Sequence, residues 1–155
     1  MCPPGRAALG RLSLAAFIVL ALAAATIQSP VASADLAFQV VVHPDIEGSQ
    51  IPRQTLSSIF LKKLNRWGSG LPVQPVDQSM RSPVRAAFTE QVLSRPFEGI
   101  QFYWGDMIRK GVAPPPVKES DADVIEYVAR TRGAIGYVSL GAEVPDMVKT
   151  LSVID

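Results

Sequence analysis

Residues 124–140 read VIEYVARTRGAIGYVSL, and this stretch joins two patterns that predict different secondary structures. In its first part, apolar residues recur with the spacing of one helix face; they are Val124, Ile125, Val128 and Ala129. Gly133 follows, and glycine is common just past a helix end. Residues 134–138 are an apolar run with β-branched members, which is typical of a buried strand. The stretch therefore predicts a helix, a glycine turn and a strand in succession.

The rest of the chain continues this alternation on both sides of residues 124–140. The other predicted strands are residues 36–42, 73–76 and 148–154. The predicted helices are residues 52–63, a helix from Ser82-Pro83 to Arg95-Pro96, a weaker one at 98–110, and the helix capped by Ser120. The proline run 113–116 is a linker or an extended edge segment. Together they predict a three-layer α/β domain, with a largely parallel or mixed sheet flanked by helices.

The first 34 residues have the organisation of a secretory signal peptide. Arg6 and Arg11 form a short basic start, and an apolar run follows over residues 12–27. Ala32-Ser33-Ala34 then gives the small-x-small pattern of a cleavage site before Asp35. We therefore expect a secreted, periplasmic protein with a single domain over residues 35–155. The alternative is an uncleaved segment that holds the chain at the membrane.

Composition excludes several classes of function for the region after residue 34. Two of the 15 lysine and arginine residues precede it, which leaves 13 against 14 acidic residues and a net charge of −1. A near-neutral surface gives no electrostatic basis for nucleic-acid binding. Cys2 is the one cysteine, so the domain has no disulfide, thiolate nucleophile or cysteine zinc site. His43 is the one histidine and lies in a His-Pro turn, so we expect neither an enzyme nor a cofactor.

One short stretch, QSMRSPVRAAF at residues 78–88, has the chemistry of an anion site. It lies between a predicted strand and a predicted helix, and a helix start offers unpaired N–H groups and partial positive charge. The candidate ligands of a small oxyanion are Ser79, Arg81, Ser82 and Arg85. The alternative is that Ser82-Pro83 simply starts a helix and both arginines are solvated.

Three segments, in this order, resemble the phosphate-transport substrate-binding proteins, which have the type 2 periplasmic binding protein fold. They are LSSIFLKKLNRWGSGLPVQPV at 56–76, SPVRAAFT at 82–89 and VIEYVARTRGAIGYVSL at 124–140. The resemblance covers about residues 40–140 and implies one lobe of a fold that has two lobes in the family. It also implies inorganic phosphate or a similar oxyanion as ligand, and a membrane transporter as partner.

The segment at residues 82–89 departs from the family pattern at several positions. Pro83 and Val84 stand where the family has glycine and threonine, which removes one N–H donor and one hydroxyl. Gln78 and Met80 stand where it has arginine and aspartate, so Ser82 is the one direct match. The resemblance therefore implies weak, reversible oxyanion binding. The alternative function is a periplasmic interaction or sensor module that kept the fold, lost the ligand and docks on a membrane receptor or transporter.

Aromatic residues at two places in the chain are relevant to these two alternative functions. Trp67 follows an amphipathic helix, which predicts that it covers the core. Phe102, Tyr103 and Trp104 are consecutive, so they cannot all face inward on one helix. We expect at least one of them to be exposed, either as part of a partner-binding patch or as a partly buried side chain.

Overall fold

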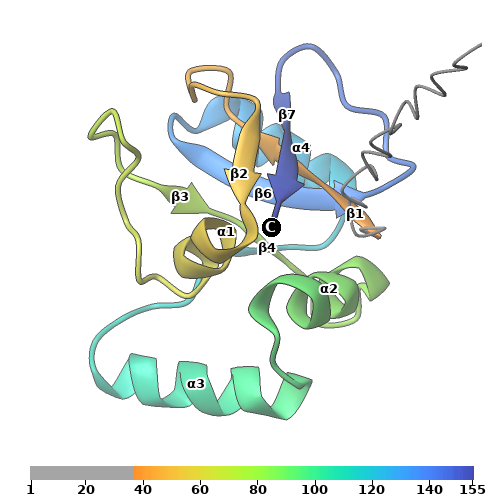
Figure 1. Cartoon of the computed structure of the whole chain (residues 1–155). Coiled ribbons are helices and arrows are strands. Elements are labelled where there is room, and N and C mark those ends of the chain that lie inside the picture. Colours follow the sequence, from red (N-terminus) through yellow and green to blue (C-terminus); the bar gives the residue numbers. More distant parts are fainter. Residues whose placement is uncertain (1–36) are drawn as a thin grey trace, which may run out of the picture. The chain divides into compact units, whose positions relative to one another are not determined.

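A five-stranded mixed sheet organises residues 37–155, which are the residues that the computed structural model describes. Its strands are β1 (Phe38–Val42), β2 (Gln50–Pro52), β3 (Gln74–Pro75), β6 (Ala134–Ser139) and β7 (Lys149–Ile154). They lie in the order β2-β7-β1-β6-β3 (Figure 1). The expected signal peptide lies outside the described residues.

The sequence predicted a sheet that is either largely parallel or mixed, and the strand directions decide between these two types. Strand β1 runs antiparallel to both β6 and β7, whereas β2 is parallel to β7 and β3 is parallel to β6. The sheet is therefore mixed. A second, two-stranded parallel pair joins β4 (Asp77–Gln78) to β5 (Val117–Lys118).

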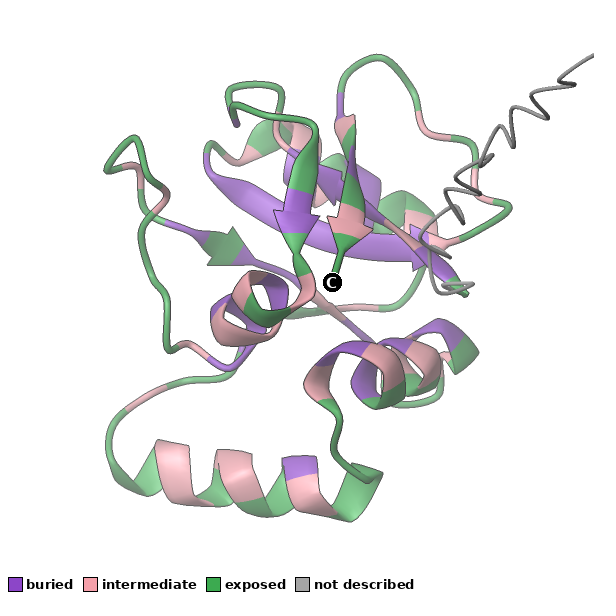
Figure 2. Ribbon diagram, viewed as in Figure 1, coloured by how far each residue is buried: buried purple, intermediate pink, exposed green. Residues whose placement is uncertain are grey.

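Helices cover both faces of the sheet, which gives the three layers that the sequence predicts. The helices are α1 (Arg53–Phe60), α2 (Pro83–Phe88), the π-turn η1 (Thr89–Leu93), α3 (Phe97–Arg109) and α4 (Asp121–Arg130). Side chains of α1, α2 and η1 share one apolar core with Val40 and Val42 of β1. Val41 points to the opposite face and packs with α4. Figure 2 shows the buried strands β1 and β6 between these helices.

Gly136 allows α4 to lie close to β6. A Cβ atom at this position would come within 2.7 Å of the Val124 side chain and 2.8 Å of the Val76 side chain. Both neighbours are fully buried and β-branched, so they have little freedom to move aside. The glycine in the middle of GAIGYV is thus required for helix–strand packing.

Several element boundaries differ from the predicted ones. Pro52 ends β2 and precedes α1, so it is not the first helical residue as predicted. The predicted helix from residue 82 to 95 continues past α2 as the π-turn η1 and ends at Ser94, which has a left-handed backbone (φ 50°). Strands β2, β4 and β5 were not predicted, because two or three residues are too few to show an alternating pattern.

Helix α3 contacts the rest of the domain sparingly. Ile100 is its one buried residue, and Figure 1 shows the helix apart from the layers that enclose the sheet. The Tyr103 hydroxyl donates a hydrogen bond to the Leu61 carbonyl over 2.7 Å. Phe102 is 77% exposed, which confirms that the three consecutive aromatic residues do not all face inward. Among residues 37–155, no helix is long and apolar enough to cross a membrane.

Candidate functional site

Strands β4 and β6 end beside each other, and α2 and α4 begin at the same place. We call this place the anion corner. It contains a cavity of about 300 Å³. The cavity is lined by Gln78, Ser79, Arg81, Ser82, Pro83, Val84, Glu119, Ser120, Asp121 and Ser139. Ligands of open α/β sheets bind at the carboxyl ends of strands, next to helix N-termini, so the corner is the ligand position that this fold predicts.

Three of the four candidate residues, Ser79, Arg81 and Ser82, line the anion corner. Ser82 is the N-cap of α2, as predicted: its hydroxyl accepts a hydrogen bond from the Arg85 backbone N–H over 3.4 Å. The same hydroxyl donates to Gln78 Oε1 over 2.7 Å. The Ser82 side chain is therefore already engaged within the protein.

Arg85, the fourth candidate, does not line the corner but pairs with a neighbouring carboxylate. Its Nη2 lies 3.0 Å from Asp77 Oδ2, and both side chains are largely buried, at 11% and 14% exposed. Its Nη1 donates to the Gln78 carbonyl over 2.6 Å. The Tyr137 hydroxyl donates a hydrogen bond to the other oxygen of Asp77. The Arg85 guanidinium thus neutralises a carboxylate of its own chain.

Burial sets the protonation behaviour of this cluster. Loss of water raises the pKa of Asp77 above its ordinary value, and the charge of Arg85 with hydrogen bonds from Tyr137 and Gln78 offsets part of that rise. Burial, with the nearby Asp77 carboxylate, also raises the pKa of Tyr137, so its hydroxyl stays protonated and remains a donor. The cluster is a largely buried, hydrogen-bonded ion pair.

Gln78 connects the buried ion pair to the corner. Its side chain is 2% exposed, and its Nε2 donates to the Tyr137 carbonyl over 2.9 Å and to Asp121 Oδ1 over 2.7 Å. The backbone N–H of Ser139 donates to the same Asp121 oxygen over 3.2 Å. The Asp121 carboxylate therefore accepts donors from the ends of both β4 and β6.

Ser79 and Arg81 have side chains that face the corner without being used elsewhere. The Ser79 backbone N–H pairs with the Lys118 carbonyl, as part of the β4–β5 connection, while its hydroxyl is free of protein partners within residues 37–155. The exposed Arg81 side chain makes no hydrogen bond or ion pair with any described residue. Together with the Ser139 hydroxyl, which also lines the corner, these two side chains are side-chain donors that the corner has available.

Four residues of the site were not predicted from the sequence: Asp77, Gln78, Asp121 and Tyr137. Asp77 directly follows a predicted strand, which was a usable signal, since strand ends are where ligands and their neighbours lie. Asp121 lies in the first turn of α4, where an acidic side chain favours the helix dipole, but its carboxylate also turns inward to Gln78.

A second, larger cavity separates α3 from the β4–α2 turn. Its volume is about 770 Å³. Apolar side chains contribute most of its lining: Met80, Phe97, Ile100, Trp104, Ile108, Pro114, Pro115 and Val117. Ser79, Arg81 and Glu119 border both cavities. We call this second cavity the α3 groove.

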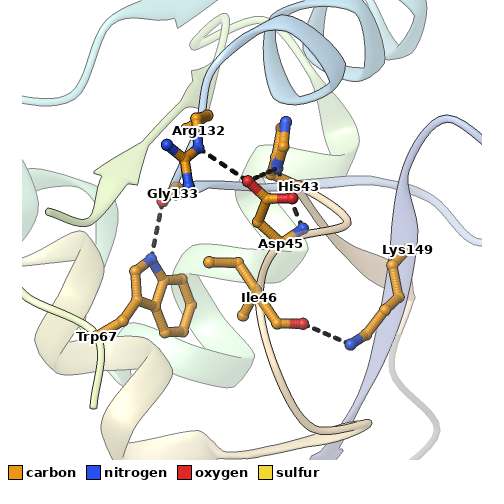
Figure 3. A network of polar contacts seen from close by, with 7 residues as sticks. All are labelled: His43, Asp45, Ile46, Trp67, Arg132, Gly133 and Lys149. Atoms are coloured by element: carbon orange, nitrogen blue, oxygen red, sulfur yellow. Dashed lines mark hydrogen bonds and ion pairs between the residues drawn. The ribbon is translucent and has the colours of Figure 1, made fainter. Parts of the chain in front are cut away.

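His43 and Trp67 hold turns at the opposite end of β6 (Figure 3). The Asp45 backbone N–H donates to His43 Nδ1 over 3.2 Å, and Arg132 Nε donates to the Asp45 carboxylate over 2.8 Å. Trp67 Nε1 donates to the Gly133 carbonyl over 2.9 Å, and its ring packs on the core as predicted. Among residues 37–155, no three His, Cys, Asp or Glu side chains are grouped so that they could hold a metal ion.

The fold is similar to part of the fold of solved proteins of ABC-type phosphate transport. PstS from Borrelia burgdorferi aligns over 76% of this chain and 47% of its own, with a TM-score of 0.60 and 18% sequence identity. An ABC-type phosphate transport receptor from Vibrio cholerae aligns over 76% of this chain and 47% of its own, with a TM-score of 0.59 and 21% identity.

These likenesses confirm the predicted fold. The chain spans about half the length of the solved structures that it matches. No protein-family model and no curated protein sequence matches it. The Vibrio cholerae structure is, by name, of an ABC-type phosphate transport receptor.

Proposed function

We propose that this chain is a secreted, periplasmic solute-binding-like domain that binds a small oxyanion, with inorganic phosphate as the reference ligand, weakly and reversibly at the anion corner. The observation that carries the proposal is the convergence of Ser79, Arg81 and Ser82 on one cavity at the carboxyl ends of β4 and β6. A fold shared with phosphate-transport proteins supports it. The domain performs no covalent chemistry, and its partner is a membrane transporter.

The state of the donors explains why binding is weak. A phosphate dianion has to lose strongly held water, and this cost is offset only when many donors converge on it. In the corner, Ser82 donates to Gln78, and outside the corner Arg85 is committed to Asp77. The remaining side-chain donors, which include Ser79 and Arg81, are few and lie at an open surface cavity. We expect dissociation constants on the order of millimolar, near 4 kcal/mol of binding free energy.

Arg81→Ala is expected to abolish the thermal stabilisation of the domain by phosphate without changing its stability in phosphate-free buffer. A ligand at about ten times its dissociation constant adds about 1.4 kcal/mol to the free energy of unfolding, which raises the melting temperature of a domain of this size by roughly 5 °C. Thermal denaturation with phosphate, at ionic strength matched by sodium chloride, measures this shift.

The matched control is Arg130→Ala, which removes an exposed arginine that borders neither the corner nor the α3 groove. It should retain the full phosphate shift. A wild-type chain that shows no shift with phosphate, sulfate or arsenate would refute anion binding at the corner.

That outcome would favour the second candidate, an interaction or sensor module that docks on a membrane receptor or transporter. The α3 groove is the observation in its favour, because its exposed apolar side chains include Phe97, Met80 and Ile108, at 41%, 52% and 57% exposed. Clustered exposed apolar side chains often mark contact surfaces. The anion screen decides between the two candidates, since docking through the groove requires no oxyanion.

A further inference from the structure

Asp121 occupies the position in the anion corner where the donors of two strands converge. Its Oδ1 accepts one hydrogen bond from the Gln78 side chain at the end of β4 and one from the Ser139 backbone N–H at the end of β6. The two donors come from residues 61 positions apart in the sequence and meet on one oxygen. A carboxylate oxygen and a phosphate oxygen are both anionic acceptors, so these donors serve either one.

The orientation of Gln78 is fixed by its other contacts. Its Oε1 accepts from the Ser82 hydroxyl, and its Nε2 also donates to the Tyr137 carbonyl. The amide therefore has one N–H left to direct into the corner, and that N–H points at Asp121. Because Gln78 is almost fully buried, its remaining N–H needs an acceptor within the protein at this point.

We propose that Asp121 is a built-in anion that fills the oxyanion position and sets the domain's low affinity for phosphate. This inference rests on the proposed function, because it concerns the same corner. Phosphate has to displace the Asp121 carboxylate, or bind beside it and experience the repulsion of a like charge. Either route weakens binding. Asp121 is thus a specificity-determining residue that disfavours anions at a site whose other donors suit them.

Replacing Asp121 is expected to strengthen phosphate binding, which is the opposite of what most substitutions near a ligand do. Asp121→Ala frees both the space and the two donors, and Asp121→Asn removes the charge while keeping the acceptor that Gln78 needs. At a separation of a few ångströms in partly buried surroundings, repulsion by one like charge weakens binding more than about tenfold. We therefore expect the dissociation constant of Asp121→Ala for phosphate to be at least about tenfold lower than that of the wild-type domain. Asp121→Asn should show a smaller gain.

Asp123→Asn is the matched control. Asp123 lies in the same first turn of α4, carries the same charge and contacts Ser120 in place of Gln78. Its substitution removes an equal charge from the helix start without emptying the corner. Isothermal titration of the full secreted domain with inorganic phosphate, at fixed ionic strength, compares the four proteins, and circular dichroism confirms that each is folded.

The outcomes separate this inference from the proposed function. Tighter binding by both Asp121 variants and unchanged binding by Asp123→Asn support the inference, including when the wild-type domain binds no phosphate at all, a result that refutes the proposed function alone. Wild-type binding that Asp121→Ala and Asp121→Asn fail to strengthen overturns the inference and leaves the proposed function intact. Absence of binding in all four proteins overturns both. Because Asp121→Asn keeps the hydrogen bond to Gln78, a folding defect of Asp121→Ala does not remove the test.

Discussion

Arg85→Ala is expected to lower the free energy of unfolding by about 3–5 kcal/mol, because it leaves the Asp77 carboxylate buried without its counter-charge. The two side chains are 11% and 14% exposed and lie 3.0 Å apart, so water screens the pair little. The substitution also removes the hydrogen bond to the Gln78 carbonyl. Urea denaturation followed by circular dichroism measures the loss.

The loss from Arg85→Ala should grow with pH. Burial holds the pKa of Asp77 in the folded protein above the 3.8 of the unfolded chain. The folded state therefore binds this proton more tightly, and the contribution of Asp77 to stability falls as the pH rises from the unfolded to the folded pKa. Removing Arg85 raises the folded pKa further and widens that window. We expect a larger deficit near pH 8 than near pH 4.

Two variants test whether charge is the cause. Asp77→Asn combined with Arg85→Ala removes both charges, so it should recover part of the stability lost by Arg85→Ala alone and should lose the pH dependence. Arg130→Ala breaks an exposed pair with Glu126 and should cost less than about 1 kcal/mol. A similarly small cost for Arg85→Ala would contradict the buried-pair description.

Phe88→Ala is expected to destabilise the domain by a comparable amount, about 3–5 kcal/mol. Phe88 is 1% exposed and stacks on Tyr137, with ring centroids 3.9 Å apart and planes within 5° of parallel. Its ring also meets Phe60 and Phe38 at centroid distances of 4.6 and 5.2 Å. The substitution therefore opens a cavity at the meeting point of α1, α2, β1 and β6. Thermal and urea denaturation should agree on the size of the loss.

Phe102→Ala is the matched control for Phe88→Ala, because Phe102 lies on α3 and is 77% exposed. Its removal should change stability by no more than about 0.5 kcal/mol. Phe88→Leu keeps most of the buried volume and should fall between the two. If Phe88→Ala were no more harmful than Phe102→Ala, the aromatic cluster would not be part of the core.

The elements that the sequence predicted well are those with enough residues to show a period. The helix at 121–130 and the strand at 134–139 agree with the interpretation of residues 124–140 to within a residue or two at most boundaries. The antiparallel pairing of β1 was not predictable, because FQVVV is buried on both faces and reads like a parallel central strand. The π-turn η1 has no sequence signal that distinguishes it from a continuing α-helix.

Three of the four candidate residues line one cavity, but the contacts of the candidate residues were not predictable from the sequence. Ser82 as a cap followed from Ser-Pro at a helix start. The partners of the arginine and the glutamine were not predictable, since Gln78 meets Asp121 across 43 positions and Tyr137 reaches Asp77 across 60. The local sequence indicates which side chains can donate hydrogen bonds. Which acceptor of the same chain they bond to depends on the fold.

The separation of α3 from the sheet has a consequence for the dynamics of the domain. With Ile100 as its one buried residue, α3 loses little apolar contact when it opens, so its amide protons should exchange with solvent through local opening. Strand β1 lies between β6 and β7 and has no exposed edge, so its amides exchange only when the whole domain unfolds. We therefore expect the α3 side of the groove to open independently of the central sheet, so that the width of the groove varies on the timescale of that local opening.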